Sequence, residues 1–176
     1  MNTDTTTEAD TRTTQIYRVY IKTTPQAIWD ALTKPEWTDR YGFGGFVDFD
    51  LTPGGRYQVR PGEEMRVASE QGGNILPEVI IEGEVVEADP PNRLVHTFHM
   101  LMDPRTSAES VTRVTYEIKE LGNGSCRLTL THDLAGAPQL AAFVAGTLEE
   151  YGAGGGHAWV LSDLKTLLET GSRMGG

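Results

Sequence analysis

The chain has 176 residues, 38% of them hydrophobic and 8% aromatic, which suits one globular domain with a substantial core. Its formal net charge of −10, without clustered Lys and Arg, argues against partners such as nucleic acid or anionic membranes. Cys126 is the single cysteine, so an intramolecular disulfide is excluded. The sequence shows no signal-peptide pattern and no apolar run long enough to span a bilayer, so we expect a cytoplasmic protein.

The first residues differ in composition from the rest of the chain. Beyond Met1, residues 1–14 contain no large apolar side chain and are rich in Thr and acidic residues, so we expect a disordered leader there. A single folded domain should then span residues 15–172. It begins with a β-branched and aromatic segment, Ile16 to Ile21, which predicts a strand.

Two short helices are predicted after this strand. Thr24 is a good helix cap, and Pro25 suits the first helical position. The apolar spacing that follows is amphipathic and stops at Lys34. Residues 35–41 predict a second short helix.

Six further strands are predicted from alternating or β-branched segments bounded by turn residues. One connection, residues 61–77, is long and polar and could hold a short strand at 65–68; loops of this length are usually mobile, and some act as lids. The expected strands cover residues 46–51, 56–60, 79–87, 93–101, 110–121 and 125–134.

The carboxyl-terminal part is helical. Residues 138–151 give a weaker helical pattern, and glycines at 152–156 separate it from the clearest helix of the chain, which Gly154 to Gly156 precede and Gly171 follows. His157 lies on the apolar stripe of this last helix, whereas Asp163 lies off it. The stripe must pack against the sheet, and it is formed by Val160, Leu161, Leu164, Leu167 and Leu168.

The order of elements predicts an α+β domain, in which a meander of antiparallel strands carries helices on one face. Alternation along the last three strands assigns the side chains beneath the closing helix. These inward side chains are Leu94, His96, Phe98 and Met100, then Val114, Tyr116 and Ile118, and then Leu128, Leu130 and His132.

Several segments together resemble the START-like (SRPBCC) superfamily, and most closely the branch named for the activator of the heat-shock-protein ATPase. The likeness spans roughly residues 15–170, and it depends on the order and spacing of motifs that are individually unspecific. The segments are Thr24-Pro25 with Ile28-Trp29-Asp30-Ala31-Leu32-Thr33, Pro53-Gly54-Gly55-Arg56-Tyr57, Pro90-Pro91-Asn92-Arg93-Leu94-Val95, Leu128-Thr129-Leu130-Thr131-His132 and Val160-Leu161 with Leu164.

The resemblance implies a helix-grip fold. In that fold a curved antiparallel sheet of about six to seven strands wraps around a long carboxyl-terminal helix, with two short helices after the first strand and a hydrophobic cavity inside. Members of the superfamily bind lipids, sterols, polyketides or plant hormones; some are cyclases or hydrolases, and a few protect producers from their own reactive natural products. Where the family often has Trp after the last glycines, this chain has His157, which implies a more polar cavity wall.

We therefore expect a cavity whose entrance is formed by the helix at Trp37 and the connection 61–77. Arg113 and Glu84 could supply polar groups to it or lie on the surface. The expected ligand-binding residues are Trp37, Tyr41, Phe43, Phe46, Tyr57, His96, Phe98, Met100, Tyr116, His132, His157 and Leu161.

Catalysis and metal binding have weaker support in the sequence. His132 and His96 are candidate general bases, although neither has an evident acid partner, so the protein is more readily a binder than an enzyme. His96 and His99 point to opposite faces of one strand and cannot form a metal pair. Cys126 fits a small buried apolar residue. We expect no metal and no cofactor.

The sequence thus predicts binding of a small hydrophobic or aromatic molecule by a monomer or weak homodimer. The alternatives are a cavity enzyme of cyclase or hydrolase type, and a self-resistance protein that sequesters a reactive natural product. A co-chaperone-like role is expected less, because eukaryotic co-chaperones of this branch usually carry an additional amino-terminal domain that residues 1–14 could not supply.

Overall fold

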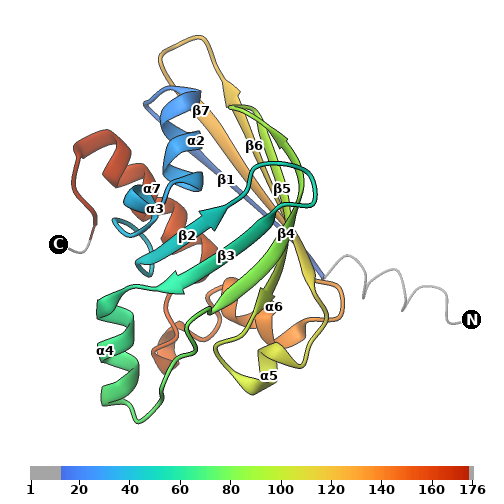
Figure 1. Ribbon diagram of the computed structural model, residues 1–176. Coiled ribbons are helices and arrows are strands. Elements are labelled where there is room, and N and C mark those ends of the chain that lie inside the picture. The colour runs from blue at the N-terminus through green and yellow to red at the C-terminus, as the bar shows by residue number, and fades with distance from the viewer. Residues whose placement is uncertain (1–12, 175–176) are drawn as a thin grey trace, which may run out of the picture.

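The computed structural model describes residues 13–174 (Figure 1). Its centre is a seven-stranded antiparallel sheet in the order β1-β7-β6-β5-β4-β3-β2, so β2 to β7 form a meander and β1 closes against β7. This is the expected α+β helix-grip architecture. The strands are β1 (Thr14–Ile21), β2 (Gly45–Phe49), β3 (Arg56–Pro61), β4 (Ile81–Asp89), β5 (Arg93–Met100), β6 (Thr112–Glu120) and β7 (Cys126–Asp133).

The helices follow the expected order with some differences in extent. The predicted helix at 138–151 is divided: Gly146 has φ 78°, and the chain continues into a short 3₁₀ turn. The connection between the strands expected at 93–101 and 110–121 contains one helical turn, Pro104–Ser107. The helices are α2 (Pro25–Thr33), α3 (Pro35–Thr38), α4 (Glu63–Gln71), α5 (Pro104–Ser107), α6 (Pro138–Val144), η1 (Glu149–Tyr151) and α7 (Gly156–Thr170).

Only the last two residues of the disordered leader expected at 1–14 are described by the structure. Residues 1–12 of the expected leader lie outside the described residues. Thr13 and Thr14 lie within them, and Thr14 already pairs with Asp133 in the β1–β7 ladder. The limits of the domain at 15 and 172 stay predictions.

The first helix forms where its cap was predicted. Thr24 Oγ1 accepts a hydrogen bond from the Ala27 amide at 3.2 Å, and Pro25 occupies the first turn. Ile28 and Ala31 are then fully buried, which fastens α2 to the core.

The expectation of a short strand at 65–68 is wrong. Residues 63–71 form the helix α4, with Gly62 before it and Glu63 and Glu64 in its first turn, where acidic side chains favour the helix dipole. None of its side chains is buried, and Figure 1 shows α4 projecting beyond the ends of β3 and β4. The segment is helical by local propensity rather than by packing.

The core lies between the sheet and α7. Leu161, Leu164 and Leu167 are buried on α7, as the apolar stripe predicts. Figure 1 places α7 beside α2 and α3, on the same face of the curved sheet. The inward faces predicted for β5, β6 and β7 are also confirmed, since all their residues are buried except Tyr116, which is half-buried.

Candidate functional site

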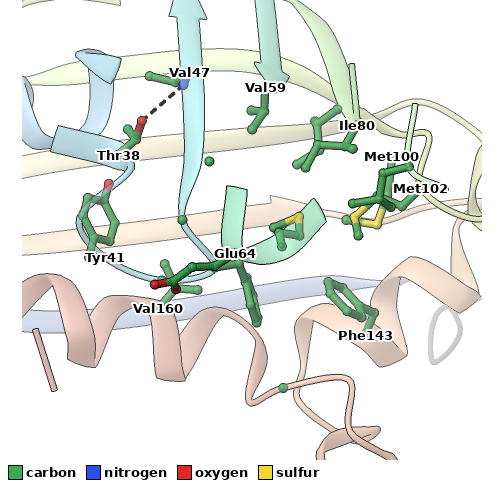
Figure 2. Close-up of a pocket in the computed structure, with 18 of the residues that line it drawn as sticks. Thr38, Tyr41, Val47, Val59, Glu64, Ile80, Met100, Met102, Phe143 and Val160 are labelled. Carbon is green, nitrogen blue, oxygen red and sulfur yellow. Dashed lines mark hydrogen bonds between the residues drawn. The ribbon is translucent and has the colours of Figure 1, made fainter. Parts of the chain in front are cut away.

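A cavity of about 700 Å³ opens between the sheet and the helices at the β2–β5 end of the molecule (Figure 2). Its floor comes from β2 to β6, and its sides come from the 41–45 loop, α4, the glycine-rich segment at 152–154 and α7. Most lining side chains are apolar. They include Val47, Phe49, Val59, Met65, Leu76, Ile80, Ile81, Met100, Met102, Phe143 and Val160.

The close-up shows how distant segments converge on this space. Thr38 and Tyr41 lie on one side, and Met100 and Met102 lie on the other (Figure 2). Glu64 lies between them at the front, on α4. The expected connection 61–77 therefore does border the cavity, but as a helix rather than as a loop.

Six of the predicted site residues line this cavity. Phe43 packs against Trp159, with ring centroids 5.4 Å apart, and borders the glycine-rich segment. There Gly154 has φ +84°, and a Cβ atom would come within 2.6 Å of the Phe43 ring, so only glycine fits. The six are Tyr41, Phe43, Tyr57, His96, Met100 and Tyr116.

The other six predicted residues lie outside the cavity wall as the structure describes it. Trp37 is covered by the Arg40 guanidinium at 4.7 Å, and the next residue, Thr38, faces the cavity instead. Phe46 lies in a shallow groove between β3 and the outer face of α4. Of the remaining four, Phe98, His132 and Leu161 are buried in the core, and His157 is half-buried against His132 and Tyr17.

His132 and His157 form a buried hydrogen-bonded chain instead of a site. Thr112 donates its hydroxyl hydrogen to the Phe98 carbonyl at 3.0 Å, so it accepts from His132 Nε2 at 2.8 Å. His132 Nδ1 is then left to accept from His157 Nε2 at 3.0 Å. Every hydrogen-bonding atom of the His132 side chain is used inside the protein.

The electrostatics of this chain favour neutral rings. Burial, together with repulsion from His157 and His96, lowers the pKa of His132 to about 3. Burial also lowers the pKa of His157 to about 4. At neutral pH both rings are uncharged, so His132 Nδ1 keeps the lone pair that accepts the hydrogen bond from His157.

His96 differs from these two residues in its surroundings. It lines the cavity, and its Nδ1 lies 2.8 Å from the Thr97 carbonyl, which can only accept, so Nδ1 carries the hydrogen. Nε2 therefore presents a lone pair on the opposite side of the ring. Burial lowers the pKa of His96 to about 4, so this lone pair is retained at neutral pH.

Two tyrosines surround His96 at the cavity floor. The ring of Tyr57 lies 4.0 Å from that of His96, and the ring of Tyr116 lies 6.1 Å away. Burial raises the pKa of Tyr116 to about 12, and burial with the neighbouring tyrosines raises that of Tyr57 well above its usual value. Within residues 13–174, neither hydroxyl has a hydrogen-bond partner. Tyr41 differs, because its hydroxyl donates to the Ala31 carbonyl at 2.8 Å.

A feature that the sequence did not indicate fastens one side of the cavity. Asp163, expected off the apolar stripe, is completely buried. Its carboxylate accepts from the Gly42 amide at 2.8 Å and the Met174 amide at 2.6 Å, and it lies 3.8 Å from Arg173. The Arg173 guanidinium donates to the Gly42 carbonyl at 2.8 Å and borders the cavity. The buried Asp163 side chain thus connects α7 to the 41–45 loop and to the carboxyl-terminal tail.

Other predicted polar residues have ordinary positions. Glu84 and Arg113 are exposed on the outside of the sheet. Cys126 is buried, and burial raises its thiol pKa, which favours the unreactive protonated form. In the part of the chain that the structure describes, no three His, Cys, Asp or Glu side chains cluster as metal ligands. No helix in residues 13–174 is long and apolar enough to cross a membrane.

Solved structures share this fold at low identity. CalU16 from Micromonospora echinospora is 20% identical, with a TM-score of 0.54 over 78% of this chain and 69% of that one. An HSP90 activator from Plasmodium falciparum is 18% identical, with a TM-score of 0.57 over 89% and 96%. The Aha1 dimer from Colwellia psychrerythraea is 16% identical, with a TM-score of 0.57 over 90% and 97%. These likenesses support the fold alone.

Among proteins with curated descriptions, none matches this sequence. The sequence pattern of one family, described as "Activator of Hsp90 ATPase homolog 1-like protein", matches residues 22–169, from the end of β1 to the last turn of α7. The match therefore includes every strand that contributes to the cavity. The chain belongs to this family, within the START-like superfamily that its segments resemble.

Proposed function

We propose that the protein binds a small, uncharged hydrophobic or aromatic molecule in the cavity. The observation that carries the proposal is the cavity of about 700 Å³, whose wall is mainly apolar and includes three polar side chains with hydrogen-bonding atoms left free by the protein. Its volume lies within the range of about 300–1,000 Å³ that is usual for ligand pockets. Apolar contact would supply about 25 cal/mol per Å² of surface removed from water.

The test uses Nile red, an uncharged apolar dye whose fluorescence rises in a nonpolar site. We expect saturable binding, competition by small aromatic compounds and a rise in melting temperature with ligand concentration. Absence of both dye binding and any melting-temperature shift over a library of hydrophobic compounds would refute the proposal.

A matched pair of substitutions in α4 tests whether the dye binds in the cavity. Ala68 lines the cavity, whereas Val67 lies one residue away on the outer groove. Ala68→Trp should fill the space and weaken dye binding at least about tenfold, while Val67→Trp should leave it within about twofold. Equal effects of the two substitutions would place the dye elsewhere.

A second candidate function is catalysis in the same cavity, favoured by the free Nε2 of His96. His132 no longer supports it, because both of its nitrogens are already hydrogen-bonded. A cyclase or hydrolase acting through His96 should convert a bound compound, detectable by mass spectrometry, and His96→Ala should abolish the conversion. Conversion that survives this substitution would exclude His96 as the base.

Sequestration of a reactive natural product such as a polyketide would use the same binding, with a different physiological result. Producer cells lacking the protein should then become sensitive to their own compound. A co-chaperone-like role would instead need a protein partner, and it predicts stimulation of an Hsp90 ATPase. A cytoplasmic monomer or weak homodimer also stays a prediction, which analytical ultracentrifugation can check for the oligomeric state.

A further inference from the structure

Three residues with a free polar atom border the floor of the cavity, on β3, β5 and β6, and the Tyr57 and Tyr116 ring centroids lie 4.0 and 6.1 Å from that of His96. His96 and Tyr57 are 2% and 7% exposed, and each lacks a protein partner in residues 13–174 for one polar atom, His96 Nε2 and the Tyr57 hydroxyl. The Tyr116 hydroxyl is a third. Among the described residues these three atoms are not fully buried unpaired groups; they are accessible from the cavity, where a bound hydroxyl can complete their hydrogen bonds.

Whether each of these three atoms donates or accepts a hydrogen bond follows from its surroundings. His96 Nδ1–H is committed to the Thr97 carbonyl, so Nε2 can only accept. The two tyrosines keep their protons, since burial raises both pKa values, so each hydroxyl can donate and accept. The His96–Tyr57–Tyr116 patch therefore offers one obligatory acceptor beside two donors.

We infer that the cavity selects uncharged aromatic alcohols, with a phenol-type hydroxyl placed on the His96–Tyr57–Tyr116 patch. Such a hydroxyl donates its hydrogen to His96 Nε2 and accepts one from Tyr57 or Tyr116, so a single ligand oxygen satisfies two of the free groups. The aromatic ring would then contact the apolar wall. This inference rests on the proposed function and specifies its ligand.

Charged ligands fit the same patch poorly. Phe49, stacked on Tyr57 with centroids 4.7 Å apart and 5.5 Å from His96, helps to keep the floor apolar. The charged side chains that border the cavity, Glu64 and Arg173, come from α4 and the carboxyl-terminal tail rather than from the floor. A carboxylate on the patch would lose its hydration and would face the lone pair of His96 without a compensating cation.

Four probes of similar shape test this selection by competition with Nile red: 2-naphthol, 2-methoxynaphthalene, naphthalene and 2-naphthoate. We expect 2-naphthol to bind about tenfold more tightly than 2-methoxynaphthalene, which keeps the oxygen but has lost the donor. Naphthalene should bind no better than 2-methoxynaphthalene, and 2-naphthoate should bind weakest.

Variants assign the preference to the patch. His96→Phe should reduce the advantage of 2-naphthol over 2-methoxynaphthalene to within about twofold, and Tyr57→Phe or Tyr116→Phe should reduce it partly. The matched control is His99→Phe: His99 is on the same strand but faces outward, where its Nε2 lies 2.8 Å from the Ser107 carbonyl. This control should keep the full preference.

One measurement needs no variant. The ¹⁵N chemical shift of His96 Nε2 should move when 2-naphthol is added, because its lone pair gains a hydrogen bond, and it should move much less with naphthalene. Equal affinities for 2-naphthol and 2-methoxynaphthalene, or an unmoved Nε2 signal with bound 2-naphthol, would overturn this inference while ligand binding itself stands. Failure of all four probes and of Nile red would overturn the proposed function as well.

Discussion

The two ends of the core use the same residue type for opposite purposes. At the closed end, where α7 packs on β1, His157 of α7 is hydrogen-bonded to His132 of β7, and His132 is hydrogen-bonded in turn to Thr112. At the open end, bounded by β2 to β5 and α4, His96 keeps one nitrogen for the cavity. Burial alone therefore does not distinguish a histidine whose nitrogens are both hydrogen-bonded within the protein from one that keeps a free nitrogen at the cavity; the unused hydrogen-bonding atom does.

The largest expected difference in unfolding free energy is between leucine-to-alanine substitutions at the closed and the open end. Leu164 is fully buried at the closed end, so Leu164→Ala should lower the free energy of unfolding by about 3–4 kcal/mol. Leu76 borders the existing cavity, so Leu76→Ala creates less new void and should cost only about 1–2 kcal/mol. Urea unfolding measures both, and equal costs would mean that the open end is packed like the closed one.

Asp163 links α7 to the 41–45 loop and to the carboxyl-terminal tail, and its removal should have the next largest effect on stability. Asp163→Ala leaves two backbone amides and Arg173 without their buried acceptor and should cost about 2–3 kcal/mol in unfolding free energy. The adjacent Ser162→Ala, on the exposed side of α7, is the control and should change stability by less than about 0.5 kcal/mol. A neutral Asp163→Ala would contradict the assigned role.

The histidine pair should make the closed end sensitive to acid. Folded pKa values of about 3 and about 4 lie below the unfolded value of 6.5, so the unfolded state binds more protons as the pH falls below 6.5. Stability is then full above pH 6.5 and is lost on acidification toward pH 4. Each ring contributes at most about 1.4 kcal/mol per pH unit.

His157→Phe tests this by removing one titrating group. Between pH 6 and 5 the unfolding free energy of the variant should fall less steeply than that of the parent, by up to about 1.4 kcal/mol per pH unit. An unchanged slope in His157→Phe would mean that the ring is already charged in the folded protein.

The smallest contrast concerns hydroxyl groups. Thr112→Val keeps the shape but breaks two hydrogen bonds at the closed end, and it should cost about 1–2 kcal/mol. Tyr116→Phe removes a hydroxyl that has no partner in residues 13–174, so it should cost less than about 0.5 kcal/mol without ligand. A large cost for Tyr116→Phe would show that its hydroxyl is engaged by the protein.

The spacing of apolar residues was sufficient to predict the strands and the last helix, because it indicates which face of each element is buried. The alternation through Leu128, Leu130 and His132 and the stripe through Leu161 and Leu164 were correct for that reason. Periodicity cannot separate an inward residue that packs against a neighbour from one that borders a void. His132 and His96 were therefore indistinguishable in the sequence.

The parts that could not be predicted depend on contacts between distant segments. Asp163 contacts the loop at Gly42 and the tail at Arg173. Gly42 precedes Asp163 by 121 residues, and Arg173 follows it by 10, so the sequence near Asp163 gives little sign of its burial. The helix α4 was missed because its polar surface and lack of buried residues resemble a loop. A count of strong helix formers in residues 63–71 would have indicated it.

Helix α4 helps to form the cavity wall without contributing to the buried core that stabilises the fold. It contributes Glu64, Met65, Ala68 and Ser69 to the cavity wall while burying no side chain of its own. Exchanging these side chains alters the size and polarity of the opening at little cost in folding free energy. The cavity wall can thus be altered by mutation in one nine-residue segment while the rest of the scaffold stays unchanged.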